Sequence, residues 1–321
     1  MARNGSIAGA VRFRPEMLLF VVTPLLFVGN MLVARAIAGD IPPVTLAFLR
    51  WSGAALVLLP FVRGLRAHLP RIVSPDFAML VLTGAVLSVA PLYAAAARTT
   101  AGNIALLLSA APALVLVVER ILFRTPLRVP AMVGILLAAC GMVTVVTHGA
   151  PLALASLSCN GGDAFALAAV LGWVAYTLLS KRRPVKLPPL IGLAALAVGA
   201  ALMLLPASLV ELARHAGEPR FGMILTPRSV SAILFLCVVP SIGAYGGYQA
   251  LVRHFGPATA ASSMYLIPVY AVLLGALLLG EALHPYHAMG LTLILGGVAL
   301  IACAKRVTPA LAPVTAAGAV S

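Results

Sequence analysis

Long apolar runs recur along this chain from residue 17 to residue 304, and they constrain its fold more than any other feature. Each run holds about 20 mostly apolar residues, enough for a helix to cross the ~30 Å hydrocarbon core of a bilayer. The bilayer core offers no water to exposed backbone groups, so a chain of such runs folds into a bundle of spanning helices. Charged residues make up only 9% of the chain, against roughly a quarter in soluble domains. The sequence therefore predicts an all-α polytopic membrane protein.

The apolar runs predict ten transmembrane helices. We expect them at residues 17–38, 44–62, 77–97, 101–122, 129–147, 163–181, 190–210, 229–252, 257–279 and 285–304. The first run lacks a small-residue cleavage site after it, so we interpret it as a span and not as a signal peptide. Residues 307–321 are rich in Ala, Pro, Val and Thr and are predicted to form a disordered tail.

The net charge of +14 could suggest a nucleic-acid partner, but the positions of the basic residues favour membrane orientation instead. With a cytoplasmic N-terminus, 16 of the 22 Lys and Arg fall on the cytoplasmic side: Arg3, Arg12, Arg14, Arg63, Arg66, Arg71, Arg120, Arg124, Arg128, Lys181, Arg182, Arg183, Lys186, Arg253, Lys305 and Arg306. We therefore expect a bacterial inner-membrane protein with both termini in the cytoplasm, embedded in lipid and without a nucleic-acid partner. The oligomeric state stays open, and a monomer fits the sequence.

One eight-residue phrase occurs twice in nearly the same form. It reads GAALVLLP at residues 53–60 and GAALMLLP at residues 199–206, a shift of 146. The same shift, followed by shifts of 152 and 156 farther along, aligns Phe27 with Trp173, Asn30 with Tyr176, Tyr93 with Tyr245, Pro112 with Pro268, Gly134 with Gly290 and Gly141 with Gly297. This collinear series predicts two five-helix repeats, at residues 1–150 and 151–306. Because five is odd, the repeats are inverted in the membrane, as in many secondary transporters.

Two segments resemble a known family. The first half contains LLFVGNMLVARAIAGDIPPVTLAFLR, and the second contains YLIPVYAVLLGALLLGEALHPYHAMGLTLILGGVALI. Both are similar to the EamA-type branch of the drug/metabolite transporter superfamily, and within it to the YddG-type amino-acid exporters. The resemblance implies outward transport of small metabolites, and it matches Arg50 to the family's second-helix arginine, with a structural or gating role.

The chain departs from the family pattern at two places. Phe27-Val28 stands where many members have Trp-Gly, and Arg124-Thr125-Pro126 stands where the second half has Gly280-Glu281-Ala282. Any role that the family assigns to this acid therefore applies to Glu281 alone.

Motifs of catalytic chemistry are missing from the sequence. It contains no His-Glu-x-x-His motif and no Cys/His cluster with metal-ligand spacing. His284 and His287 are three residues apart, but interfacial polar residues are the favoured interpretation over a metal pair. We therefore expect no enzyme activity, no metal and no cofactor.

Polar and aromatic side chains inside apolar helices are the candidate substrate ligands, because a mid-span Tyr, Trp or Asn needs a polar partner or a wet space. The predicted substrate-binding residues are Asn30, Tyr93, Trp173, Tyr176, Tyr245, Gln249 and Tyr265. We expect Asn30 to lie opposite Trp173 and Tyr176. Trp51 and Tyr248 fit an interfacial aromatic belt. Arg50 and Arg98 are expected to face the outer headgroups, which leaves the path itself neutral.

Glu119 is the only acidic residue inside a predicted span, and it is the one candidate for proton coupling. The favoured interpretation is an interfacial ion pair with the neighbouring Arg120, Arg124 and Arg128, and a proton relay is the alternative. A neutral, aromatic-lined path predicts uncoupled export of neutral or aromatic amino acids by alternating access. A proton-coupled drug or metabolite efflux carrier and a channel remain as alternatives.

Overall fold

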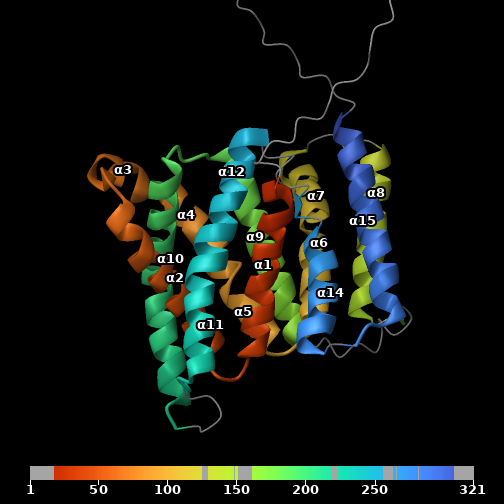
Figure 1. Cartoon of the computed structure of the whole chain (residues 1–321). Coiled ribbons are helices and arrows are strands. Elements are labelled where there is room, and N and C mark those ends of the chain that lie inside the picture. Colours follow the sequence, from red (N-terminus) through yellow and green to blue (C-terminus); the bar gives the residue numbers. More distant parts are fainter. Residues whose placement is uncertain are drawn as a thin grey trace, which may run out of the picture.

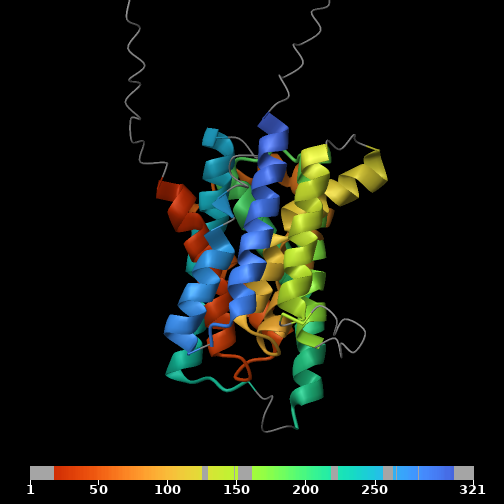
Figure 2. The same cartoon turned by 90° about the vertical axis from the view of Figure 1, so that its right-hand side faces the viewer.

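The structure is a computed structural model of the chain, and it describes residues 18–124, 129–147, 149–150, 161–217, 223–255, 263–264, 266–280 and 282–306. In these ranges the chain is a bundle of roughly aligned helices without a β-sheet (Figures 1 and 2). The expected tail at residues 307–321 lies outside them.

The first half contributes α1 to α8, joined by short 3₁₀ and π segments. Their bounds are α1 Leu19–Ala36, α2 Pro43–Leu58, η2 Leu59–Phe61, η3 Leu65–His68, α3 Leu69–Ile72, α4 Pro75–Val81, η4 Leu82–Leu87, α5 Ala90–Ala96, α6 Ala101–Ser109, α7 Ala111–Phe123 and α8 Val129–Val146. The second half contributes α9 Gly161–Arg182, α10 Pro189–His215, α11 Pro227–Val238, η6 Val239–Ala244, α12 Tyr245–Phe255, α14 Leu266–Leu279 and α15 Pro285–Arg306.

Six helical stretches are long and apolar enough to cross a membrane, among the residues that the structure describes. They are Leu19–Ala36, Pro43–Phe61, Pro75–Ala96, Gly161–Arg182, Pro189–His215 and Pro227–Leu251. Each of the ten expected ranges overlaps at least one helix. Six single helices meet the length and composition of a span, and α6 and α7 meet them together as a bent pair, so ten crossings stay a prediction. Large apolar side chains such as Leu56, Ile121 and Leu277 face outward, as expected where lipid replaces water.

Helix starts are built alike in the two halves. α2 and α10 each begin with a proline at the first helical position, where the missing N–H costs nothing. α4 and α11 each follow a hydroxyl cap: the Ser74 side chain accepts from the Phe77 N–H, and the Thr226 side chain accepts from the Ser229 N–H.

The fourth expected span is broken. The sequence predicts one helix over 101–122, whereas the structure has α6 and α7, bent by 40° relative to each other. Pro112 lies in the first turn of α7 and lacks the N–H that would continue the hydrogen bonding of α6. The aligned Pro268 lies near the start of α14.

Two spans contain π-helical segments that the sequence pattern did not predict. η4 separates α4 from α5, and η6 separates α11 from α12. Pro240 in η6 offers no N–H to the carbonyl of Leu236, and the Ser241 hydroxyl donates to that oxygen instead, at 2.8 Å. Such π segments often mark functional positions in helices.

α8 and α15 pack closely in opposite directions, side by side in both views (Figures 1 and 2). A Cβ added to Gly141 would lie 2.8 Å from the Gly290 carbonyl oxygen, and one added to Gly297 would overlap the Gly134 carbonyl oxygen. As residue numbers rise along α8 they fall along α15, so the two helices are antiparallel. Paired glycines allow this close approach of backbones.

α2 and α10 are the second antiparallel pair that joins the halves. The Glu211 carboxylate, near the end of α10, accepts from the backbone N–H of Thr45 at 2.7 Å and of Val44 at 3.2 Å, at the start of α2. It also accepts from the Thr45 hydroxyl at 2.9 Å. This carboxylate supplies acceptors to the free N–H groups of α2, which has no side-chain cap of its own.

The remaining contacts between helices occur in equivalent pairs, one for each half of the chain. α1 packs on α14, and its counterpart α9 packs on α6 and α7. α1 also packs on η6 and α12, and α9 packs on η4 and α5. The main buried core is formed jointly by these helices, with many alanines at the crossings.

Candidate functional site

A buried arginine lies at the centre of a polar network between α1, α2, α5 and η6. Arg50 is 1% exposed. Its Nε donates to the Ser241 hydroxyl at 2.7 Å, and its Nη1 donates to Asn30 Oδ1 at 3.2 Å and to the Tyr93 hydroxyl at 3.1 Å. The Tyr93 hydroxyl in turn donates to Asn30 Oδ1 at 2.7 Å. We call these four residues the Arg50 network.

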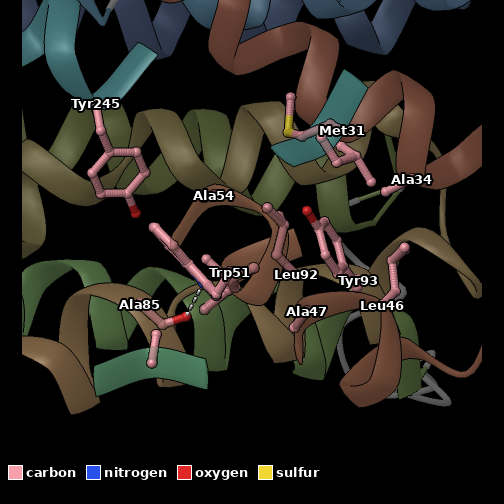
Figure 3. Close-up of a cluster of buried hydrophobic side chains, with 14 of the residues drawn as sticks. Met31, Ala34, Leu46, Ala47, Trp51, Ala54, Ala85, Leu92, Tyr93 and Tyr245 are labelled. Atoms are coloured by element: carbon pink, nitrogen blue, oxygen red, sulfur yellow. Dashed lines mark hydrogen bonds between the residues drawn. The ribbon is translucent and has the colours of Figure 1, made fainter. Parts of the chain in front are cut away.

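Two aromatic rings complete the surroundings of the guanidinium. Its carbon lies 4.7 Å from the centre of the Trp51 ring and 5.9 Å from the centre of the Tyr245 ring. Both rings are anchored to η4: Trp51 Nε1 donates to the Ala85 carbonyl at 3.2 Å, and the Tyr245 hydroxyl donates to the Gly84 carbonyl at 2.8 Å. Figure 3 shows Trp51 and its bond to Ala85 within the buried cluster that also contains Tyr93 and Tyr245.

The positive charge of Arg50 is solvated by neutral groups. No carboxylate of the described residues contacts it. Hydrogen bonds from a charged donor contribute about 1.5–3 kcal/mol each, and a desolvated cation–π contact adds about 2 kcal/mol. These contacts offset the several kcal/mol that burying an ion costs, but they leave one full charge without a counter-ion in the described part of the bundle.

Two expectations from the sequence are wrong at this site. Arg50 does not face the outer headgroups, and Trp51, with 0% exposure, does not belong to an interfacial belt. The prediction of a path without a deep basic residue fails with them. Hydropathy depends only on the residue type. It therefore could not show that oxygens from three other elements solvate this guanidinium inside the protein.

Aromatic rings from both halves gather beside the Arg50 network. The Trp173 ring centre lies 6.2 Å from that of Phe27, 5.4 Å from Tyr176, 6.2 Å from Tyr245 and 6.3 Å from Tyr248. We call these five residues the aromatic cluster. Trp173, Tyr176 and Tyr248 are half-buried, while Tyr245 is buried and touches both the cluster and the Arg50 network.

Close packing against η4 holds α9 in position. A Cβ added to Gly172 would lie 2.8 Å from the Leu87 carbonyl carbon, and one added to Gly84 would overlap the Tyr176 ring. α9 can therefore approach η4 only because both positions are glycine. This approach places Trp173 and Tyr176 where Tyr245 meets them.

The structure brings most of the sequence-predicted residues together. Tyr93 and Asn30 belong to the Arg50 network, and Trp173, Tyr176 and Tyr245 belong to the aromatic cluster. Their role in binding stays a prediction.

The other candidates are placed as follows. Gln249 is half-buried in α12, one turn after Tyr245, and Tyr265 lies outside the described residues. Tyr248 faces the aromatic cluster, where an interfacial belt was expected. The contacts of Asn30 are with Arg50 and Tyr93, and Tyr245 links this network to the cluster.

Phe27 was not among the sequence-predicted ligands because a lone Phe in an apolar helix carries no polar signal. A signal was present in the repeat alignment, which pairs Phe27 with Trp173. If a two-fold axis relates the two halves, equivalent residues that lie near this axis contact each other.

Glu119 forms an ion pair, but with another partner than expected. Its Oε1 lies 2.5 Å from Nζ of Lys181 at the end of α9. Arg120 and Arg124 are exposed, and Arg128 lies outside the described residues. Arg120 and Arg124 do not pair with Glu119. Successive residues of a helix point about 100° apart, so Arg120 does not share the buried face of Glu119. The expected pairing with Arg128 stays a prediction. The Lys181 side chain is 63% exposed, which places the pair at the edge of the bundle.

The two histidines noted in the sequence contact an aromatic residue and each other. The Tyr286 ring stacks on His284, with ring centres 5.3 Å apart, and is tilted against His287 at 4.2 Å, while the two histidine ring centres are 5.9 Å apart. No group of three metal-ligating side chains occurs in the portion of the chain that the structure describes.

Comparison with known proteins points to one family. Residues 14–147 and 160–303 each match the EamA-like transporter family. A Pseudomonas aeruginosa protein named "Uncharacterized protein PA1977" is 33% identical over 90% of this chain and 94% of its own length. The Escherichia coli "Uncharacterized inner membrane transporter YedA" is 28% identical over 94% of this chain and 95% of its own length.

Further similarities agree with this family. The Bacillus subtilis "Uncharacterized transporter YetK" is 24% identical over 93% of this chain and 91% of its own length. A crystal structure that shares 18% identity superposes with a TM-score of 0.60 over 91% of this chain and 98% of its own, which supports the fold alone. The family and these names point to transport and not to catalysis. The chain belongs to the EamA-like transporter family and is a multi-pass membrane transporter of small molecules that carries two copies of the family domain.

Proposed function

We propose that this protein exports neutral and aromatic amino acids, and similar metabolites, by alternating access. The observation that carries the proposal is the aromatic cluster around Trp173, where Phe27 of one half meets Trp173 and Tyr245 of the other. Aromatic rings offer large apolar surface together with polar edges, which suits amino-acid side chains. The outward direction rests on the resemblance to YddG-type exporters.

The proposed architecture is ten spanning helices in two inverted repeats, at residues 1–150 and 151–306. The antiparallel α8–α15 and α2–α10 pairs support inversion, because repeats related by an axis along the membrane normal would make their equivalent helices parallel. The matched contact of Phe27 with Trp173 supports an axis near the aromatic cluster. Binding near the midplane between such repeats is usual for secondary transporters.

The proposed location is the bacterial inner membrane, with both termini in the cytoplasm. The charge bias of the predicted loops and the name of the Escherichia coli relative support it.

We propose that transport is not coupled to a proton gradient. A proton-driven carrier needs a titratable group that reaches both sides of the membrane in turn. Glu119 is paired with Lys181 at the edge of the bundle, which supports a fixed ion pair and no relay. The alternative is a proton-coupled efflux carrier, and the burial of Glu119, at 7% exposure, is the observation in its favour.

Counterflow in proteoliposomes tests the function. Vesicles preloaded with unlabelled phenylalanine should take up labelled phenylalanine, tyrosine or leucine without a pH gradient or a membrane potential. Vesicles without protein are the control, and a sugar phosphate is the comparison substrate. Counterflow of the sugar phosphate alone would contradict the proposed substrate class. A current that follows the ion gradient, with no counterflow of any substrate, would favour a channel.

A further inference from the structure

The charge of Arg50 is the one strong chemical feature of the site that the proposed function does not use. It is buried in the protein, and all three of its hydrogen-bond acceptors are neutral oxygens, those of Ser241, Asn30 and Tyr93. A guanidinium in a low-dielectric site attracts an anion strongly. Within the described ranges the protein supplies none at this position, so an anion must come from elsewhere if the charge is to be paired.

The hydrogen bonds around Arg50 are of two kinds. Ser241 is held in place because its hydroxyl also donates to the Leu236 carbonyl within η6. Nη1, by contrast, donates to both Asn30 and Tyr93, and these two side chains also form a hydrogen bond with each other. These two bonds can be exchanged for an incoming acceptor without stranding either side chain, because the Tyr93 hydroxyl continues to donate to Asn30 Oδ1.

A carboxylate is the acceptor that this geometry suits. It accepts two parallel N–H bonds from a guanidinium and adds the charge pairing that a neutral oxygen lacks. Tyr245 touches both the guanidinium and the Trp173 ring. A molecule held at Arg50 by its carboxylate would therefore have its side chain directed toward the aromatic cluster.

The two halves are not equivalent at this position. The repeat alignment places Leu196 where the first half has Arg50, and Leu196 is buried in α10. Arg50 therefore has no symmetry-related cation at the equivalent position of α10. A single anchor suits a substrate with one carboxylate.

We propose that Arg50 is the residue that binds the carboxylate of the transported molecule, so that the substrate class is small monocarboxylates with an apolar or aromatic side chain. This inference rests on the proposed function for the identity of the site, and it adds the chemical group that the site selects.

The first experiment uses the wild-type protein and matched competitors. Phenylalanine and phenylalaninamide differ only in that the amide lacks the carboxylate. Both are titrated as inhibitors of labelled phenylalanine counterflow in proteoliposomes. We expect the amide to inhibit at least about tenfold more weakly, because it loses a charge-assisted pair worth more than a neutral hydrogen bond. Equal inhibition by the two compounds would overturn the proposal.

The second experiment changes the arginine. Arg50→Gln should lose the discrimination between phenylalanine and its amide, and Arg50→Lys should retain part of it because the charge is kept. Arg98→Gln is the control, since Arg98 is exposed and lies two residues after the end of α5. A purely structural role would lower transport of all competitors equally and leave the discrimination intact, which would overturn the proposal. If Arg50→Gln does not fold, the wild-type competition decides the question.

A third measurement separates this inference from the substrate proposal. Should the wild-type protein move no amino acid, the thermal unfolding midpoint of the purified protein is measured with 3-phenylpropionate and with its amide. The carboxylate should raise the midpoint and the amide should not, and Arg50→Gln should abolish the difference. That result would retain the carboxylate site while rejecting amino acids as substrates. Equal shifts, including no shift from either compound, would overturn the carboxylate site.

Discussion

Trp173 lies where the two halves of the bundle meet through aromatic contacts. Its ring lies against Phe27 of α1 and against Tyr245 and Tyr248 of α12, and it is half-buried rather than sealed in the core. A side chain in this position can contribute to a substrate surface without being essential to the packing of α9. Its role can therefore be separated from stability by mutation.

Trp173→Ala should lower amino-acid counterflow at least about tenfold, because it removes the largest aromatic surface of the cluster, while leaving expression intact. Trp173→Phe should retain more activity. Phe165→Ala is the matched control, as Phe165 is an exposed aromatic residue on the same helix. Counterflow of Trp173→Ala at the wild-type rate would show that the aromatic cluster does not bind the substrate.

Glu119→Gln tests the coupling. We expect the variant to perform counterflow at a rate close to wild type, because an ion pair with an exposed lysine contributes little beyond about 1 kcal/mol. An imposed proton gradient should drive no uphill accumulation in either protein, as measured with labelled phenylalanine. Uphill accumulation by the wild type that disappears in Glu119→Gln would replace the uncoupled mechanism with a proton-coupled one.

At the scale of elements, sequence patterns predict the helices well because the length and apolarity of a run are local properties. α2, α9 and α10 begin within two residues of the expected spans, and the paired prolines and hydroxyl caps at helix starts are visible in the sequence. The break between α6 and α7 and the η6 segment were not predicted, because the apolar runs continue across Pro112 and Pro240. The η4 segment contains no proline that could mark it.

The site was predicted only in part, for a related reason. Mid-span polar and aromatic residues such as Asn30, Tyr93 and Trp173 stand out against apolar helices. The depth of Arg50 does not, since it depends on acceptors that lie far away in the sequence, on α1, α5 and η6. From its charge alone, Arg50 was therefore expected to contact lipid headgroups, whereas the tertiary structure buries it among protein oxygens.

The contact between α8 and α15 makes an element-level prediction. Gly297→Ala should lower stability by about 1–3 kcal/mol, because the new methyl group overlaps the Gly134 carbonyl of the facing helix. The adjacent Gly296 has open space at its Cβ, so Gly296→Ala should be neutral or raise stability by up to about 1 kcal/mol. Thermal unfolding in detergent measures both. Equal midpoints for the two variants would contradict the close glycine contact.

In the whole molecule, the proposed transport mechanism depends on how the two family domains are oriented. The family matches at residues 14–147 and 160–303 show two domains but do not say how each domain is oriented in the membrane. Antiparallel contacts at α8–α15 and α2–α10 support inversion, and the bias of basic residues predicts the direction of each half. Inversion is what would let one conformational change close the path on one face and open it on the other.

The most direct test of this claim compares two positions that correspond in the repeats. The shift of 146 pairs Asp40, before α2, with Lys186, before α10. Single cysteines are introduced there by Asp40→Cys and Lys186→Cys in a protein whose four native cysteines are replaced, and intact spheroplasts are treated with a membrane-impermeant maleimide. An inverted arrangement predicts labelling of Asp40→Cys from outside and of Lys186→Cys only after permeabilisation. Labelling of both positions from the same side would contradict the inverted arrangement.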